Sequence, residues 1–480
     1  MNITDATRTE PVPVDQLGKV HFAGIGGAGM SGIARIMLAR GVPVSGSDAR
    51  PSEMLTQLAA LGADVHVGHD ASHLGGADTL VVSTAIRADN PELNEARARG
   101  LRILHRAAAL ASVMLGKAVV AVAGTHGKTT TSSMLTTILL TAGEDPGYAI
   151  GGVLTGSGLG AAWGSGPAFV AEADESDRSF LLLSPDTAIV TNIEADHLDN
   201  YASLAEIEQT FAAFARRITP GGLLIACADD PGAQALAAAV AGQPIRIRGY
   251  GESAAADYRL SDVQPRGMGI SRTVTAGREP GAGPASQRIE LGVPGRHNAL
   301  NAVAAFAAAV ELGVPWPQAA AGLAAYRGAR RRLELKGEGH GDRVLDSYAH
   351  HPTEMSADLR TAREIVGAGR VLVVFQPHLY SRTRLFAAEF GTALGLADQA
   401  FVLDVYAARE DPEPGVSGAL IADGVPDGKA RYLPHADEIP QAVAEAARPG
   451  DLVLTMGAGD VTTLGPLLVS ALHVAERAAR

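Results

Sequence analysis

The sequence has little cysteine, no long apolar run and no excess of basic residues. Its 480 residues include a single cysteine, Cys227, so no disulfide can form within the chain, which fits a reducing compartment. No apolar run reaches the roughly 18 to 20 residues of a membrane-spanning helix, and residues 1–20 lack the continuous apolar segment of a secretion signal. These absences predict a cytoplasmic protein without membrane insertion.

The net charge is -12 and the sequence contains no long basic stretch, which gives little electrostatic reason to expect a nucleic-acid partner. Aromatic residues make up only 4% of the chain, whereas hydrophobic residues make up 46% and glycine occurs 56 times. This composition is typical of a globular α/β protein whose cores are built from Ala, Val, Leu and Ile. The length suggests about three domains.

Apolar strands that alternate with Ala- and Leu-rich helical stretches predict a three-domain α/β fold with parallel sheets. We place a Rossmann-like N-terminal domain at 1–116, a P-loop-type central ATPase domain at 117–326 and a Rossmann-like C-terminal domain at 327–480. The Gly- and Pro-rich stretch 271–287 is predicted to be an exposed irregular or hairpin excursion. The strands that define the domains are expected at 19–23, 42–45, 79–83, 102–104, 118–122, 169–171, 188–191, 223–226, 343–345, 371–375, 400–403 and 452–455.

The first motif is a glycine-rich turn between a strand and a helix, Gly24-Ile25-Gly26-Gly27-Ala28-Gly29, with Asp48 about one βα unit later. Glycines at this place allow a diphosphate to approach the helix N-terminus, where unpaired N–H groups favour anions. By itself the motif suggests a nicotinamide dehydrogenase, but it does not choose between a dinucleotide and another nucleotide diphosphate. Tight packing of strand on helix, with no ligand, is the plainer alternative.

The second motif, Gly124-Thr125-His126-Gly127-Lys128-Thr129-Thr130-Thr131, also lies between an apolar strand and a helical stretch. In a phosphate loop, backbone N–H groups wrap the β-phosphate, the lysine meets the β and γ oxygens, and the hydroxyl after it reaches Mg²⁺. The chain departs from the strict pattern because Val122 replaces its first glycine. A polar helix start capped by Thr125 or Thr129 is the alternative, but it does not explain Lys128.

Acidic residues follow two predicted strands of the central domain, in Glu172-Ala173-Asp174-Glu175-Ser176-Asp177 and in the stretch from Thr191 to Asp199. Ligands of open α/β sheets collect beyond the carboxyl ends of strands, so these acids could hold Mg²⁺ beside ATP. Glu172 and His197 are the preferred candidates, although imidazole is a doubtful ligand for Mg²⁺ on physical grounds. Solvated turns or helix caps explain Asp177, Glu194 and Asp199 at least equally well.

At this point the chain resembles the Mur ligase family, whose central domain is shared with folylpolyglutamate synthetases. The matching motifs span about residues 20 to 460 in the order of the family, and the ordered set is far more specific than any one of them. They are HFAGIGGAGMSGIA (21–34), GTHGKTTT (124–131), EADESD (172–177), TNIEADHLD (191–199), GRHNALNA (295–302), SYAHHPTE (347–354), FQPHLYSRT (375–383) and GAGD (457–460).

The resemblance implies roles for the first two domains. The first domain would bind the UDP part of a sugar nucleotide through Gly24, Gly26, Gly27, Ala28, Gly29, Met30 and Asp48. The central domain would bind ATP through Gly124, Thr125, His126, Gly127, Lys128, Thr129 and Thr130, with Asn298 and Asn301 on the adenine side. Thr129, Glu172 and His197 would be ligands of Mg²⁺ or Mn²⁺, and Lys128, Glu172, His197 and Arg332 would be the catalytic set.

In the third domain the resemblance implies that Arg332 reaches the ATP phosphates and that Tyr348, His350, His351 and Arg382 form the amino-acid site. Arg382 suits a carboxylate because its planar guanidinium can make paired hydrogen bonds. The family usually has an aspartate immediately before the Tyr-Ala-His stretch, where this chain has Ser347. Either Asp346, one place earlier, takes over the contact with ATP, or Ser347 makes a weaker one.

The member of the family that the motifs resemble attaches L-alanine to the lactyl carboxylate of UDP-N-acetylmuramate, with ATP as co-substrate, through an acyl phosphate. The nearest alternative is a sister ligase that attaches a preformed peptide to the same sugar nucleotide. A nicotinamide-dependent oxidoreductase and a non-catalytic nucleotide-binding regulator are the alternatives of other classes. We expect a monomer or a homodimer, and no nucleic-acid partner.

Overall fold

The computed structural model describes residues 11–198, 200–266, 268–276, 285–339, 341–408 and 410–479. Asp199 of the fourth motif lies outside these residues, as do residues 277–284 of the predicted excursion. Among the helices described, none is long and apolar enough to cross a membrane.

The first sheet is parallel, with the strand order β3-β2-β1-β4-β5. The order reverses beside β1, and in such sheets ligands bind beyond the carboxyl ends of the strands at the reversal. Asn90 and Ser52 start two of the helices by accepting backbone N–H groups. The strands are β1 (Val20–Ala23), β2 (Val44–Asp48), β3 (Asp64–Val67), β4 (Thr79–Val82) and β5 (Arg102–His105), and the helices are α2 (Ala28–Ala39), α3 (Glu53–Ala60), α4 (Pro91–Ala98) and α5 (Arg106–Met114).

The central sheet has ten strands in the order β15-β14-β13-β12-β11-β10-β6-β9-β7-β8. Its strands are β6 (Ala118–Ala123), β7 (Gly147–Ala149), β8 (Ala161–Ala162), β9 (Ala168–Glu172), β10 (Thr187–Val190), β11 (Leu223–Cys227), β12 (Arg246–Gly251), β13 (Tyr258–Arg266), β14 (Gly269–Ala276) and β15 (Ala285–Leu291). Its helices are α6 (Lys128–Thr141), α7 (Leu204–Ala215), α8 (Pro231–Ala239), α9 (Arg296–Glu311) and α10 (Trp316–Ala325). Ser271 and Arg272, which we expected in an exposed excursion, are each only 1% exposed within β14, so that expectation was wrong for them.

In the central sheet, β6 runs parallel to β10 on one side and to β9 on the other. The carboxyl ends of these strands therefore meet at one edge of the sheet, and the segments that follow them carry the second, third and fourth motifs. All of β6 except Ala118 is buried, as expected of a parallel strand covered on both faces.

The third sheet has the order β16-β17-β21-β18-β19-β20, and only the pairing of β16 with β17 is antiparallel. Its strands are β16 (Arg332–Gly339), β17 (Asp342–Ser347), β18 (Val371–Phe375), β19 (Gln399–Val402), β20 (Ala430–Tyr432) and β21 (Leu452–Met456). Its helices are α11 (Pro352–Val366), α12 (Tyr380–Leu385), α13 (Ala387–Leu394), α14 (Gly418–Ala422), α15 (Ile439–Ala446) and α16 (Leu464–Ala479).

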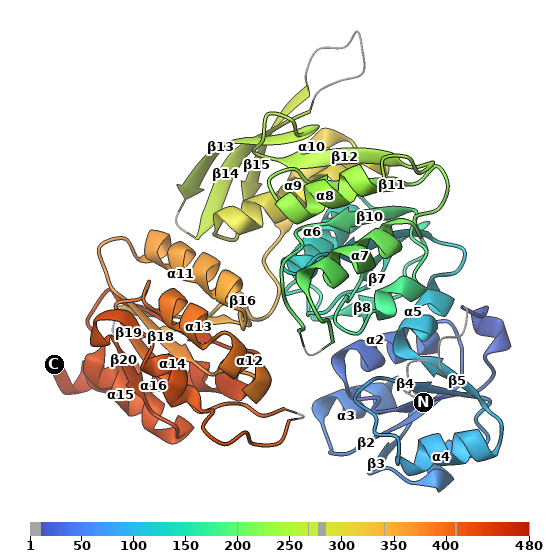
Figure 1. Cartoon of the computed structure of the whole chain (residues 1–480), viewed down its shortest axis with the longest axis horizontal. Coiled ribbons are helices and arrows are strands. Elements are labelled where there is room, and N and C mark those ends of the chain that lie inside the picture. The colour runs from blue at the N-terminus through green and yellow to red at the C-terminus, as the bar shows by residue number, and fades with distance from the viewer. Residues whose placement is uncertain are drawn as a thin grey trace. The chain divides into compact units, whose positions relative to one another are not determined.

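Alternate residues of β18 pack on opposite faces of the third sheet. Val371, Val373 and Phe375 join one core with residues of α11 and α13, whereas Leu372 and Val374 join another with residues of α15 and α16. The period of two follows from strand geometry, in which successive side chains point to opposite faces. Figure 1 shows these helices on the two sides of the sheet.

The described chain divides into two compact units. The first covers Met1–Ser261, Thr273–Ile289 and Leu300–Tyr326, and the second covers Asp262–Arg272, Glu290–Ala299 and Arg327–Arg480. The first and central sheets therefore belong largely to the first unit, and the third sheet belongs to the second.

Candidate active site

The loop 124–127 joins β6 to α6 and is held by the segment that follows β10. Asn192 accepts the His126 N–H through Oδ1 at 2.8 Å and donates to the His126 carbonyl through Nδ2 at 3.1 Å. Gly127 has a φ of 83°, and a Cβ placed on it would lie 2.6 Å from Oδ1 of Asn301. The position therefore requires glycine, and the loop is preformed with its N–H groups at the start of α6, where an anion is favoured.

Lys128, the first residue of α6, is fully engaged with the protein. Its Nζ donates to the carbonyls of Gly124 at 2.7 Å and Thr125 at 3.0 Å, and to Oε1 of Glu175 at 2.9 Å. Burial alone lowers the pKa of Lys128, but Glu175, Asp174 and Glu172 outweigh it and raise the pKa above its ordinary value. Lys128 is therefore a charged ammonium beside the loop.

Glu175 is 2% exposed, and among the described residues its Oε2 has no hydrogen-bond partner. Burial raises the pKa of its carboxyl, against the attraction of the Lys128 ammonium. Our sequence analysis did not assign Glu175 a role. Its place three residues after Glu172 at the end of β9 was the available signal, but its contact with Lys128 depends on the fold.

Thr129 and Glu172 lie together beside the phosphate loop. The Thr129 hydroxyl donates to Glu172 at 3.0 Å for Oε2 and 3.2 Å for Oε1, and the Gly151 N–H donates to Oε2 at 2.7 Å. A hydroxyl and a carboxylate beside a phosphate loop are oxygen donors of the kind that Mg²⁺ prefers. These two residues therefore fit the predicted metal site.

His197 follows β10 and has a φ of 52°. Its Nε2 lies 3.6 Å from Oδ2 of Asp196 and 3.8 Å from Oε1 of Glu175. The structure therefore brings His197 to the carboxylate that holds Lys128.

Asn298 and Asn301 lie one turn apart on α9 and are 5% and 7% exposed. Asn298 donates to the Pro294 carbonyl at 2.6 Å, which is a helix-start contact, whereas Asn301 approaches the phosphate loop at Gly127. Their adenine-side role stays a prediction.

The first glycine-rich loop follows β1, and Gly24 in it has a φ of 80°. The Gly26 N–H donates to Oδ2 of Asp48 at 3.0 Å, so Asp48 holds the loop itself. Gly27 is the N-cap of α2, Ala28 and Gly29 form its first turn, and Met30 is buried. The loop thus presents the start of α2 at the carboxyl edge of the first sheet.

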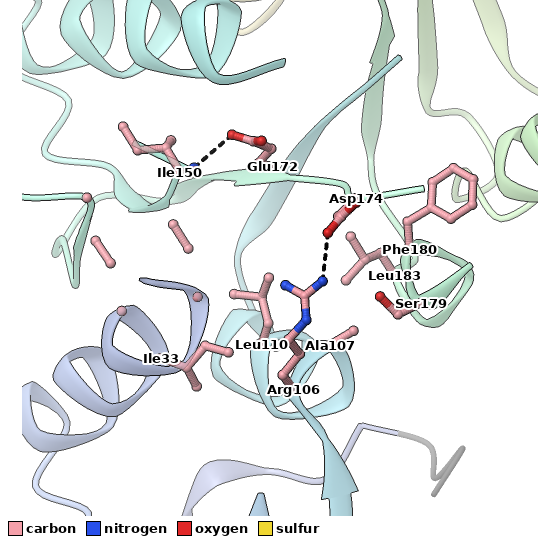
Figure 2. Close-up of a pocket in the computed structure, with 16 residues that line it drawn as sticks. Ile33, Arg106, Ala107, Leu110, Ile150, Glu172, Asp174, Ser179, Phe180 and Leu183 are labelled. Carbon is pink, nitrogen blue, oxygen red and sulfur yellow. Dashed lines mark hydrogen bonds and ion pairs between the residues drawn. The ribbon is translucent and has the colours of Figure 1, made fainter. Parts of the chain in front are cut away.

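A pocket of about 150 Å³ lies between the start of α2 and the acids after β9 (Figure 2). Gly29, Gly32 and Ile33 line it from α2, Glu172 lines it from β9, and Asp174 lines it from the segment that follows. Figure 2 shows Arg106 of α5 inside it, joined to Asp174. One cavity therefore connects the first predicted site to the second.

In the second unit, Arg332 and Tyr348 lie at the start of β16 and just after β17. The Arg332 guanidinium carbon is 5.4 Å from the centre of the Tyr348 ring, and its Nη1 is 3.9 Å from Oε1 of Glu354. His350 contacts the Tyr348 carbonyl through Nδ1 at 3.0 Å. His351 is the N-cap of α11, and Arg382 is buried within α12. Tyr348, His350 and Arg332 thus form one group.

Asp346 is completely buried and accepts the hydroxyls of Thr455 and Thr462, each at 2.7 Å. Nζ of Lys336 lies 3.6 Å from it. This geometry ties Asp346 to the interior of the third sheet and does not favour its predicted contact with ATP. Ser347 in turn donates to Oδ2 of Asp358 on α11 at 2.5 Å.

The chain matches three family models in order. They are described as "Mur ligase family, catalytic domain" over residues 19–118, "Mur ligase middle domain" over 122–309 and "Mur ligase, glutamate ligase domain" over 331–459. Together they cover most of the chain.

Two curated relatives are UDP-N-acetylmuramate–L-alanine ligases. The protein of Kineococcus radiotolerans is 58% identical over 96% of this chain and 97% of its own, and that of Thermobifida fusca is 55% identical over 97% and 98%. A crystal structure of the UDP-N-acetylmuramate-alanine ligase of Thermotoga maritima matches with a TM-score of 0.79 and 28% identity, over 96% of this chain and 100% of that one. A murein peptide ligase of Psychrobacter arcticus matches with a TM-score of 0.71 and 28% identity, over 95% and 99%.

Proposed function

Because this chain belongs to the Mur ligase family, we propose that it is an ATP-dependent ligase that joins L-alanine to the lactyl carboxylate of UDP-N-acetylmuramate. The product is UDP-N-acetylmuramoyl-L-alanine, a precursor of peptidoglycan, and ADP and phosphate are released. The relatives that are more than half identical to this chain over nearly its full length are named for this reaction.

The observation that carries the proposal is the pocket that extends from Gly29 to Glu172. A sugar nucleotide whose diphosphate lies at the start of α2 would extend its sugar through this pocket toward the phosphate loop. Its carboxylate would then lie beside Glu172, which itself contacts Thr129 next to Lys128. A dehydrogenase has no use for a phosphate loop at the end of its cofactor pocket.

The chemistry begins from the weak electrophilicity of a carboxylate, which needs a better leaving group before an amine can displace it. The lactyl carboxylate attacks the γ-phosphorus of ATP, the bond to the β-phosphate oxygen breaks, and ADP and an acyl phosphate result. The free amine of L-alanine attacks the acyl carbon, and the tetrahedral intermediate loses phosphate to give the amide. Lys128 and Arg332 are the cations proposed to neutralise the transferring group.

Mg²⁺ is proposed to be held by Thr129 and Glu172, with His197 completing the site beside Glu175. When bound, the ion would neutralise phosphate charge and orient ATP. In the second unit, Tyr348, His350, His351 and Arg382 are proposed to bind L-alanine, with the buried Arg382 directed to its carboxylate.

A sister ligase that attaches a preformed peptide is the second candidate, since a murein peptide ligase also matches this chain. The higher TM-score of the alanine ligase and the curated relatives favour L-alanine. Because the reaction consumes ATP and a nucleotide sugar, we propose that it takes place in the cytoplasm.

Phosphate release by the purified protein tests the proposal. MgATP, UDP-N-acetylmuramate and each amino acid are supplied in turn, and each component is omitted once. We expect release that requires every component and is fastest with L-alanine. Release only with a peptide acceptor would move the assignment to the sister ligase, and no release with any acceptor would contradict a ligase.

A further inference from the structure

Arg106 lies inside the pocket and is held by acids from the other side of it. It is the first residue of α5, directly after β5. Its Nη2 donates to Oδ2 of Asp174 at 2.7 Å and lies 3.7 Å from Oδ2 of Asp177. The second oxygen of Asp174 accepts the Ser176 N–H at 3.0 Å. These contacts restrict the orientation of the guanidinium, and Figure 2 shows the one with Asp174.

The pKa values fit a persistent ion pair. Burial raises the pKa of the Asp174 carboxyl, but Arg106 and Lys128 outweigh it and hold the pKa well below its ordinary value. The geometry agrees with this direction, because Nη2 of Arg106 lies 2.7 Å from Oδ2 of Asp174.

The Arg106 guanidinium has more N–H groups than the protein uses. Among the described residues, Nε and Nη1 have no hydrogen-bond partner, since the bond to Asp174 engages Nη2 alone. Nη1 points toward the start of α2, because a Cβ placed on Gly29 would lie 3.3 Å from it. The Nη1 end of the guanidinium therefore faces the pocket, where its N–H groups suit an oxyanion.

The charge of the pocket makes Arg106 necessary for an anionic ligand. Among the described residues that line the pocket, Arg106 is the only basic one, whereas Glu172 and Asp174 are acidic. The rest of the lining is glycine, alanine, serine and large apolar side chains. Without a cation, this pocket would repel an anion and leave its charge poorly solvated.

We propose that Arg106 binds an oxyanion of the sugar nucleotide through the edge of its guanidinium that faces the pocket, while Asp174 and Asp177 hold it in position. The inference rests on the proposed function, because it assumes that a sugar nucleotide enters this pocket. The oxyanion is either the diphosphate at the α2 end or the lactyl carboxylate at the Glu172 end. The chemistry of recognition is the same for both, and the experiment separates them.

The test measures calorimetric dissociation constants of Arg106→Gln and of the unaltered protein for UDP-N-acetylmuramate, UDP-N-acetylglucosamine and MgATP. UDP-N-acetylglucosamine has the diphosphate but no lactyl carboxylate. We expect Arg106→Gln to bind UDP-N-acetylmuramate about tenfold or more weakly, with MgATP binding unchanged. If the diphosphate is the ligand, both sugar nucleotides weaken alike; if the carboxylate is the ligand, only UDP-N-acetylmuramate weakens.

Arg102→Gln is the matched control, because Arg102 is the first residue of β5, the strand that ends just before Arg106, and donates to the Gln16 carbonyl at 2.7 Å. It should leave all three dissociation constants unchanged. Binding of UDP-N-acetylmuramate by Arg106→Gln within about twofold of the unaltered protein overturns the inference.

If Arg106→Gln loses MgATP binding as well, Arg106→Lys decides. This variant keeps the positive charge and the ion pair but not the forked guanidinium. A normal MgATP affinity together with sugar-nucleotide binding that is weaker by about threefold or more supports the role of Arg106. Unchanged sugar-nucleotide binding refutes it. Failure of the unaltered protein to bind UDP-N-acetylmuramate would instead contradict the proposed function.

Discussion

At the scale of single residues, the ion pair of Lys128 with Glu175 occupies the lysine of the phosphate loop at 2.9 Å. The bonds to Gly124, Thr125 and Glu175 use every N–H group of the Lys128 ammonium. A phosphate can therefore reach Lys128 only by displacing one of these partners. Glu175 competes most strongly, because it carries the same sign of charge as the phosphate.

Glu175→Gln is expected to tighten ADP binding by about tenfold in the absence of divalent metal, because a neutral amide holds Lys128 less strongly than a carboxylate. Calorimetry in the presence of a chelator measures the effect. Glu206→Gln is the control, since it removes another acid that pairs with a base, Arg178 at 2.6 Å, away from the loop. Unchanged or weaker ADP binding by Glu175→Gln would contradict this role.

At the scale of elements, one buried carboxylate joins several parts of the first domain. Glu92 of α4 is fully buried and accepts the hydroxyl of Ser47 on β2 at 2.7 Å. His69 and His73, which follow β3, lie 3.3 Å from it, and His21 on β1 lies 3.6 Å from it. Burial raises the pKa of Glu92, but the hydrogen bond from Ser47 and the nearby imidazoles of His21 and His69 outweigh it and lower the pKa to about 2.

Because the pKa of folded Glu92 lies below its ordinary value of 4.5, its contribution to stability is present above about pH 4.5 and is lost as the pH falls toward 2. The lowered pKa of Glu92 corresponds to a contribution on the order of 3 kcal/mol to the free energy of unfolding at neutral pH. Glu92→Gln should therefore lower the midpoint of thermal unfolding at pH 7. The difference in midpoint from the unaltered protein should mostly disappear near pH 2. A deficit that does not shrink as the pH falls would contradict the argument.

At the scale of the whole molecule, we propose that the two nucleotides bind at different sheets. The first glycine-rich loop follows β1 of the first sheet, and the phosphate loop follows β6 of the central sheet. The first loop is held by Asp48 of β2, and the phosphate loop is held by Asn192, which follows β10 of the central sheet. Loss of one binding site should therefore leave the other nearly intact.

Lys128→Ala is expected to abolish phosphate release while changing the affinity for UDP-N-acetylmuramate by less than about twofold. Calorimetry and the phosphate assay measure the two properties separately. Lys19→Ala, at the amino edge of the first sheet, is the control and should change neither. Loss of sugar-nucleotide binding together with catalysis in Lys128→Ala would count against separate sites.

The sequence alone was sufficient for the family, the three-domain α/β fold and the reaction, because these depend on local patterns. The buried strands β6 and β18 are continuous apolar runs, and the phosphate loop is a contiguous motif. The sequence analysis did not predict β7, β8 or β20, because strands of two or three residues are too short to show a period.

Only the tertiary structure decided which side chains meet. Arg106 and Asp174 are 68 residues apart, and Lys128 and Glu175 are 47 apart, so no local pattern relates them. Lys128 and Glu175 meet because the parallel strands β6 and β9 end at one edge of the central sheet, whereas Arg106 and Asp174 follow strands of two different sheets. The interior place of Asp346 likewise follows from Thr455 and Thr462, more than 100 residues further along. Local periodicity specifies the strands and loops, and the folded backbone specifies the partners of each charged side chain.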